Sequence, residues 1–165
     1  KYIYIIMSNF DKVKDEFNKS FGVTNNLTPQ LNIFDENPAL VNYRLDLIKE
    51  EVEELKDSIE KKDFKETIDA LSDILYVVYG AFTCFGINGD EAFDLVHKSN
   101  MSKLCKNKKE AIATVEYYKN DSRYDSPTYR LSPDEKYYVV YNESTSKILK
   151  SINYNPVSFD SLINK

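Results

Sequence analysis

Residues Thr67–Gly89 read TIDALSDILYVVYGAFTCFGING, and this stretch decides the fold. Its only charged residues are Asp69 and Asp73, which stand one helical turn apart. Most of the other positions are apolar, and a helix formed here would end at Gly86. A helix that is apolar on most of its circumference belongs in the middle of a bundle. The stretch therefore predicts a core helix of a helical protein.

The two aspartates need an explanation in such a helix. Like charges one turn apart repel, Asp is a poor helix former, and a buried unpaired carboxylate is costly. The stretch holds no Lys or Arg that could neutralise Asp69 and Asp73. A divalent cation shared with carboxylates of a facing helix would explain the pair, and Mg²⁺ prefers such all-oxygen ligands. The alternative is that the pair lies exposed on a polar side of the protein.

The preceding helix, predicted over roughly 38–61, supplies carboxylates that can face this pair. At helical spacing Glu50, Glu51 and Glu54 share one flank, whereas Glu53 points elsewhere. An apolar stripe runs a quarter to a third of a turn away, formed by Leu45, Ile48, Val52, Leu55 and Ile59. A Glu-rich helix on its own usually forms a solvated face. A short connection makes the two helices antiparallel neighbours, however, so the Glu flank can meet the two aspartates.

Spacing and capping signals predict the other helices. We expect a first helix over 9–20, a loop over 21–38, a fourth helix after Gly89 and a fifth over about 108–120. Asp63 is the predicted N-cap of the third helix, with Glu66 as its capping-box partner.

The character of the chain changes after Asp121. Short β-prone runs at 129–131, 136–141 and 147–150 predict a small antiparallel sheet. The expected fold is therefore all-α, with a four- to five-helix bundle over 1–121 and a small β-rich C-terminal extension over 122–165.

Net charge, cysteine content and hydrophobicity argue against several classes of function. A formal charge of −5 argues against nucleic acid as the main partner. Cys84 and Cys105 form neither a metal-ligand spacing nor a disulfide framework, so we expect reduced thiols and an intracellular, cytoplasmic protein. No apolar run approaches the roughly 20 residues that span a bilayer, and no signal peptide is evident, so no membrane partner is expected. We assign no function to the opening residues 1–6.

Three motifs follow one another between about residues 40 and 104. Arg44–Glu54 reads RLDLIKEEVEE, Asp69–Gly80 reads DALSDILYVVYG, and Val96–Lys103 reads VHKSNMSK. Together they resemble the MazG-like all-α NTP pyrophosphohydrolases. The similarity is greatest to the phosphoribosyl-ATP pyrophosphohydrolase-like branch, which includes phage and viral proteins and dUTP-preferring members. The tail residues Lys147–Lys150 and Tyr154–Pro156 are similar to that branch more weakly.

One position departs from the family pattern. Many members carry Glu three residues before the motif aspartate, where this chain has Ala70, and its acid lies instead at Asp69. The distance from Asp73 to Asn100 favours Asp73 as the motif aspartate. Whether Glu66 joins the site stays open.

The resemblance implies a Mg²⁺-dependent hydrolase, with Mn²⁺ as a substitute, that cleaves a nucleoside triphosphate into its monophosphate and pyrophosphate. The implied metal ligands are Glu51, Glu54, Asp69 and Asp73. The candidate catalytic residues are Glu50 and Glu51, with Glu50 positioning or deprotonating the attacking water. The candidate substrate contacts are Lys98 and Lys103 for phosphate, Asn100 for a base or sugar, and Asn42 for a base.

Because small members of this family generally associate, a homodimer or homotetramer is expected. The expected role is housekeeping of the nucleotide pool, with dUTP and dCTP as candidate substrates. Two alternatives stay open: hydrolysis of phosphoribosyl-ATP in histidine synthesis, and a non-catalytic acidic helical interaction protein.

Overall fold

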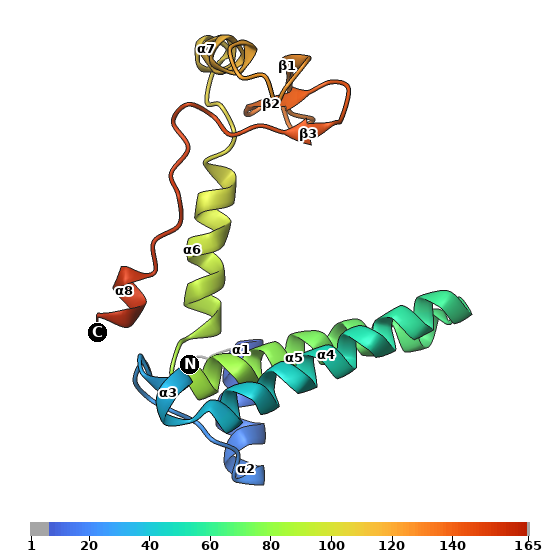
Figure 1. Ribbon diagram of the computed structural model, residues 1–165, viewed down its shortest axis with the longest axis vertical. Helices are drawn as coiled ribbons and strands as arrows, with labels where there is room; N and C mark the ends of the chain where they lie inside the picture. The colour runs from blue at the N-terminus through green and yellow to red at the C-terminus, as the bar shows by residue number, and fades with distance from the viewer. Residues whose placement is uncertain (1–6, 165) are drawn as a thin grey trace, which may run out of the picture. The chain divides into compact units, whose positions relative to one another are not determined.

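The computed structural model describes residues 7–164 and divides the chain into two compact units. One unit runs to Phe93 and includes the residues from Phe159 onward, and the other comprises Asp94–Ser158. Figure 1 shows the elements in chain order. Residues 1–6, to which the sequence assigned no function, lie outside the described residues.

The first unit is helical and is dominated by two long helices, α4 (Pro38–Lys61) and α5 (Phe64–Phe85). Shorter helical pieces precede them, namely α1 (Asn9–Asp11), the π-helix η1 (Lys12–Asn18), α2 (Lys19–Phe21) and α3 (Ile33–Glu36). Helix α6 (Gly89–Met101) begins in this unit and continues into the second, and α8 (Asp160–Ile163) lies near the C-terminus.

Capping residues set the bounds of α4 and α5. The side chain of Asn37 accepts a hydrogen bond from the Leu40 N–H, and proline occupies the first position of α4. Lys62, with φ of 56°, ends α4 in the left-handed conformation. Asp63 then caps α5 by accepting from the N–H groups of Lys65 and Glu66. The predicted bounds of both helices and the predicted Asp63 cap are confirmed.

Helices α4 and α5 lie side by side as an antiparallel hairpin (Figure 1). Far from the turn, Arg44 Nε donates to Cys84 Sγ at 3.0 Å, and a Cβ atom on Gly80 would lie 3.0 Å from Arg44 Nη1. Near the turn, Thr67 Oγ1 donates to Ser58 Oγ at 3.2 Å. Position 51 stands midway between 44 and 58, so this register sets it opposite the turn of α5 that runs from position 73 to position 76.

The N-terminal helical segment packs on the C-terminal half of α5. Asn18 is buried and its Nδ2 donates to Thr83 Oγ1 at 2.9 Å. The rings of Phe17 and Tyr76 make an edge-to-face contact with centroids 5.3 Å apart. A helix was predicted over 9–20, and one is present, but its central residues are π-helical rather than α-helical.

A loop encloses the C-terminal end of α5. The backbone N–H groups of Asn26 and Gln30 donate to the carbonyl oxygens of Thr83 and Phe85, both at 3.0 Å. Gly86 terminates the helix at φ of 71°, and a Cβ atom there would lie 1.8 Å from the Thr28 carbonyl oxygen. Only glycine meets both demands, because the conformation is left-handed and the space is filled.

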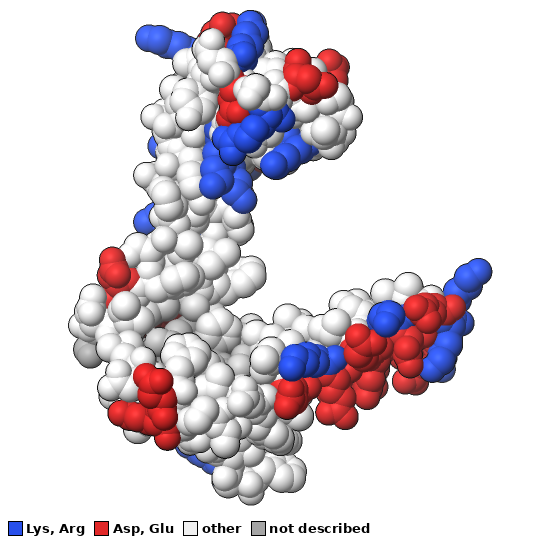
Figure 2. All heavy atoms as spheres, viewed as in Figure 1, with Lys and Arg blue, Asp and Glu red and all other residues white. Residues whose placement is uncertain are grey.

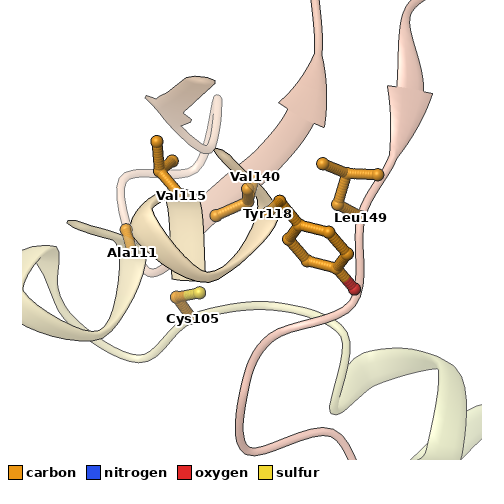
Figure 3. Close-up of a cluster of buried hydrophobic side chains, with 6 residues drawn as sticks. All are labelled: Cys105, Ala111, Val115, Tyr118, Val140 and Leu149. Atoms are coloured by element: carbon orange, nitrogen blue, oxygen red, sulfur yellow. The ribbon is translucent and has the colours of Figure 1, made fainter. Parts of the chain in front are cut away.

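The second unit combines α7 (Lys108–Lys119) with three strands, β1 (Pro127–Leu131), β2 (Tyr138–Asn142) and β3 (Lys147–Ile148). The strands form an antiparallel sheet in the order β1-β2-β3, as predicted. Helix α7 packs on β1 and β2. Figure 3 shows the core between them, which consists of Cys105, Ala111, Val115, Tyr118, Val140 and Leu149. The predicted boundary at residue 121 lies inside this unit, because α7 buries its apolar side on the strands.

Much of the apolar surface of the hairpin is exposed within the chain. On α4, Leu45, Val52 and Ile59 are between 46% and 58% exposed, and on α5 Leu71 and Leu75 are 50% and 61% exposed. The buried residues of α5 are small or polar: Ala70, Gly80, Thr83 and Cys84. For a single chain, the prediction that α5 is enclosed in a bundle is therefore wrong.

Helix α5 is also long and apolar enough to cross a membrane by length and composition alone, a test that core helices of soluble proteins pass as well. Asp69 and Asp73 would be costly within lipid. The charged helix α4 runs along α5 as well. We therefore attribute the apolar surface of α5 to packing against protein.

Gly86→Ala should lower the free energy of unfolding by about 3 kcal/mol, because the added methyl group collides with the Thr28 carbonyl oxygen in a left-handed turn. Gly22→Ala is the matched control. Its φ of 65° is also left-handed, but no atom lies within 4 Å of the added Cβ atom, so the cost should be about 1 kcal/mol. Denaturant unfolding of both variants measures the difference. Equal losses would show that the enclosed end of α5 is not rigid.

Candidate active site

The carboxylates singled out from the sequence lie on the facing halves of one hairpin. Glu50, Glu51 and Glu54 stand on α4, and Asp69 and Asp73 stand on α5. The register set by the Arg44 and Ser58 contacts brings Glu51 opposite the turn of α5 that begins at Asp73, and the charge of Asp73 acts on Glu51. Figure 2 shows Asp and Glu side chains gathered along the arm formed by these two helices.

Glu51 is the central member of this group. It is half-buried, and its Oε2 atom is buried without a hydrogen-bond partner. Burial, followed by the negative charges of Glu54, Asp73, Glu50 and Asp69, raises the pKa of the Glu51 carboxyl above its ordinary value of 4.5. The four other predicted carboxylates are thus close enough to act on Glu51 electrostatically. A buried, unpaired carboxylate oxygen among like charges is a position that a cation would stabilise.

Within residues 7–164, no ion pair to Lys or Arg neutralises these five carboxylates. The nearest lysines in sequence are engaged on the other flank of α4: Lys49 pairs with Asp46 at 3.0 Å, and Lys56 pairs with Glu53 at 3.1 Å. Glu53 therefore points away from the group, as predicted. No Lys or Arg side chain in the described part of the chain therefore offsets the charge of the acidic group, which favours a bound cation.

The carboxylate groups are suitable ligands for Mg²⁺, but their side chains do not point to a common centre. Carboxylate oxygens are the ligands that Mg²⁺ prefers. Among the described residues, however, no three Asp, Glu, His or Cys side chains lie close enough together to hold a metal ion. Glu50, Glu54 and Asp69 are exposed and free to change rotamer, whereas Glu51 and Asp73 are half-buried. Binding a cation would thus require the exposed side chains to turn toward Glu51 and Asp73.

Glu66 stands in the first turn of α5. Its backbone N–H donates to Asp63 Oδ1 at 3.2 Å, and its side chain is exposed. This contact gives Glu66 a place in the cap of the helix. The Asp63 side chain, rather than Glu66, satisfies the free N–H groups at this end.

Arg44 has a place in the site region that the sequence reasoning did not assign. It is 8% exposed, and its guanidinium lies on α5 between Gly80 and Cys84. It stands seven residues before Glu51, so both face the same seam between α4 and α5. That spacing, in a motif already quoted for its acidic residues, is the signal that could have revealed it. Gly80 leaves room beneath it, because a Cβ atom there would lie 3.0 Å from Nη1 and the guanidinium would have to shift by a few tenths of an ångström.

The predicted substrate contacts lie in both units. Asn42 is exposed near the start of α4. Lys98, Asn100 and Lys103 belong to the second unit, where Lys103 Nζ donates to Asn100 Oδ1 at 2.7 Å. Lys98 is exposed and lines a cavity of that unit. The first unit thus carries the predicted metal ligands, and the second carries the predicted phosphate-binding lysines.

Comparison with known proteins identifies a family and a viral relative. The sequence model of the family described as Phosphoribosyl-ATP pyrophosphohydrolase matches residues 15–100, a range that contains the five carboxylates together with Lys98 and Asn100. The chain is also 34% identical to "Uncharacterized protein L479" of Acanthamoeba polyphaga mimivirus, over an alignment that covers 90% of this chain and 93% of the viral protein.

The raised pKa of Glu51 predicts how metal-free stability depends on pH. A raised pKa means that the folded chain binds more protons than the unfolded chain at pH values between the two pKa values. In EDTA the free energy of unfolding should therefore fall as the pH rises from about 4.5 through the folded pKa, and the full destabilisation remains above it. Glu51→Gln should remove this fall, so that the variant matches the wild type at pH 4 and is more stable at pH 8. Thermal unfolding of the wild type and of Glu51→Gln between pH 4 and pH 8 measures this difference in stability.

Glu53→Gln is the control for that measurement, because Glu53 pairs with Lys56 on the opposite flank. It should follow the wild-type pH profile above pH 4.5. A Glu51→Gln variant that is no more stable than the wild type at pH 8 would contradict the placement of Glu51 among the other carboxylates.

Proposed function

Because the chain belongs to the phosphoribosyl-ATP pyrophosphohydrolase family, we propose that it is a Mg²⁺-dependent pyrophosphohydrolase of nucleoside triphosphates. Membership of the family implies pyrophosphohydrolase activity on a nucleotide in general. The proposal is narrower: the substrate is a (deoxy)nucleoside triphosphate, and the products are its monophosphate and pyrophosphate. The single observation that carries it is that the Oε2 atom of Glu51 is buried without a hydrogen-bond partner while four other carboxylates act on this side chain.

The proposed metal ligands are Glu51, Glu54, Asp69 and Asp73, with Mn²⁺ able to replace Mg²⁺. When bound, the cation supplies charge neutralisation for the triphosphate. The half-buried Glu51 and Asp73 are held by the α4–α5 register, so they form the fixed side of the site. The exposed Glu54 and Asp69 form the adjustable side.

Glu50 is the proposed acceptor of the water proton. Hydrolysis forms one bond from a water oxygen to phosphorus and breaks the bridging P–O bond between the α and β phosphates. The water proton passes to a carboxylate, and pyrophosphate and the monophosphate separate. Glu50 is exposed and stands next to Glu51 in the chain, so it can reach a water at the edge of the acidic group. Glu51 is the second candidate for this role, because it stands beside Glu50 in the chain.

A role in the nucleotide pool inside the cell, with dUTP or dCTP as preferred substrates, belongs to the same proposal. Hydrolysis of phosphoribosyl-ATP is the second candidate, because the matching family model carries that description. The same carboxylate chemistry would serve both substrates, so only a direct comparison of substrates separates them.

We also propose that a second copy of the chain covers the apolar side of the hairpin. On α5, Phe64, Ile68, Leu71 and Leu75 follow one another at spacings of four, three and four residues. On α4, Leu45, Ile48, Val52, Leu55 and Ile59 repeat at spacings of three and four. This spacing is the seam of helices that pack side by side in bundles. Two hairpins that join along these seams would form a four-helix bundle as a homodimer, or within a homotetramer.

Asp73→Asn should reduce kcat/KM for the preferred nucleotide at least a hundredfold, which corresponds to about 2.7 kcal/mol of transition-state stabilisation. The assay incubates the protein with a panel of NTPs, dNTPs and phosphoribosyl-ATP in Mg²⁺ and identifies products by chromatography. Glu53→Gln, whose carboxylate faces Lys56, should stay within twofold of the wild type. If folded wild-type protein consumes none of these substrates in Mg²⁺ or Mn²⁺, the chain is a non-catalytic interaction protein instead.

Leu75→Glu should dissociate the proposed dimer, because it places a charge in the middle of the apolar seam of α5. Light scattering should give at least twice the 19.2 kDa chain mass for the wild type and a smaller mass for this variant. Ser72→Glu adds the same charge at an exposed α5 position off the seam and should keep the wild-type mass. A monomeric wild type at micromolar concentration would rule out the association.

A further inference from the structure

One edge of the sheet in the second unit is open, because the strand order β1-β2-β3 places β1 on the outside (Figure 1). Just beyond β1, the Ser132 N–H donates to the Tyr137 carbonyl oxygen at 2.8 Å. Hydrogen-bonded positions alternate along an antiparallel strand, so the even-numbered residues of β1 bond to β2. The backbone groups of its odd-numbered residues point away from the sheet, and these residues are Pro127, Tyr129 and Leu131.

No described part of the chain pairs with this edge. Within residues 7–164, the carbonyl of Pro127 and the N–H and carbonyl groups of Tyr129 and Leu131 take part in no hydrogen bond. Natural proteins usually protect an open edge with charged side chains, bulges or a covering segment. Here the central residue of the edge is a tyrosine, and the apolar Leu131 beyond it is 43% exposed. The edge is therefore suited to a further strand.

A second copy of β1 fits this edge in a self-complementary register. If Tyr129 lies on a two-fold axis, it faces Tyr129 of the second copy, and each N–H donates to the other carbonyl oxygen. Leu131 then lies opposite Pro127 of the second copy and donates its N–H to the proline carbonyl oxygen. The N–H that proline lacks falls at the ends of the pairing, where the facing carbonyl is open to solvent.

Arg130 favours this register over the neighbouring one. Tyr129 pairs with Val140 of the core beneath α7, so Thr128 and Arg130 lie on the other face of the sheet. An axis at Arg130 would set two guanidinium groups directly opposite each other, which destabilises a strand pair. With the axis at Tyr129, Arg130 lies opposite Thr128 of the second copy instead.

The position of α7 agrees with such a pairing. Helix α7 packs over β1 and β2. In a continuous sheet formed by two copies, the two α7 helices would lie on the same face and two strand spacings apart, which is about 10 Å. Packed helices lie 8–10 Å apart, so the two helices would be in contact.

The flank of α7 that would meet the second copy carries an exposed apolar residue. On the opposite flank, Glu110 accepts from Ser151 Oγ, and Thr114 Oγ1 accepts from the Ile152 N–H at 3.2 Å, both in the segment after β3. Ile112 stands about half a turn around the helix from both, so it points toward the β1 edge. It is 45% exposed, and its burial against the second copy would add apolar contact to the strand pairing.

We propose that a second copy of this chain pairs with the open edge of β1, with Tyr129 on the two-fold axis and the two α7 helices side by side. The interface stands on the helix and strands of the second unit alone. It depends neither on the carboxylate site nor on the apolar seams of α4 and α5. A chain that uses both the β1 edge and those seams assembles beyond a dimer.

Cysteine cross-linking tests the pairing and its register. Pro127→Cys and Leu131→Cys place thiols on facing residues of the two copies, whose Cα atoms should lie about 5.5 Å apart, a distance that a disulfide spans. Neither variant should cross-link alone, whereas the two variants mixed in reductant and then oxidised should give a disulfide-linked dimer on a non-reducing gel. The native Cys84 and Cys105 are buried, so they should not react.

Light scattering provides the second test, in a Leu75→Glu background that removes association through the α5 seam. Leu75→Glu should have twice the 19.2 kDa chain mass. Adding Leu131→Pro should give a monomer, because it removes an outward N–H. Adding Leu131→Ala shortens the same side chain but keeps the N–H, so this control should stay dimeric. Circular dichroism should show both variants folded, since this N–H takes no part in the β1–β2 ladder.

The outcomes separate the two interfaces. A mixture of the cysteine variants that forms no cross-linked dimer would overturn the proposal, as would an equal cross-link by either variant alone. A monomeric Leu75→Glu variant would overturn it as well. If Leu131→Pro alone reduces the wild type to a monomer while Leu75→Glu leaves its mass unchanged, the association through the seams fails and the β1 interface stands.

Discussion

Five carboxylates lie along one hairpin, and their mutual repulsion has to be offset by the contacts that hold the rest of the first unit together. Glu51 has a buried oxygen with no partner, and its burial together with four neighbouring negative charges raises its pKa. That arrangement is unfavourable without a cation, so the fold must hold α4 and α5 together by other means. It does so at the two ends, where Arg44 lies on Gly80 and Cys84, and where Ser58 meets Thr67 beside the Asp63 cap.

The same hairpin has an acidic edge and an apolar side. A single chain supplies neither a cation for the acidic edge nor a second hairpin for the apolar side. The acidic edge is suited to a divalent cation. The apolar seams that end in Ile59 and Leu75 are suited to a second hairpin. The small buried residues of α5, such as Ala70 and Gly80, allow α4 to approach closely and leave the large apolar side chains pointing outward. The proposed metal site and the proposed interface with a second chain therefore lie on different sides of α4 and α5.

The sequence predicted the elements well because their signals are local. Pro38, Asp63 and Gly86 fix helix ends through capping and left-handed geometry, and the alternating runs after Asp121 formed the expected sheet. It also grouped the five carboxylates, since spacings of three and four residues define a helix face. What it missed depends on long-range packing. The burial of Arg44, the exposure of Leu75, the packing of α7 on the strands and the cavity beside Lys98 each require knowing which elements meet.

The central claim is that the carboxylates of α4 and α5 bind a divalent cation, and Mn²⁺ binding followed by electron paramagnetic resonance tests it most directly. Titration of the wild type should remove free Mn²⁺ from solution at a saturable site, and Mg²⁺ should compete for it. The double variant Asp69→Asn/Asp73→Asn should leave the Mn²⁺ signal free, whereas Glu53→Gln should bind like the wild type. Equal Mn²⁺ binding by the wild type and the double variant, or none by either with dUTP present, would contradict the account.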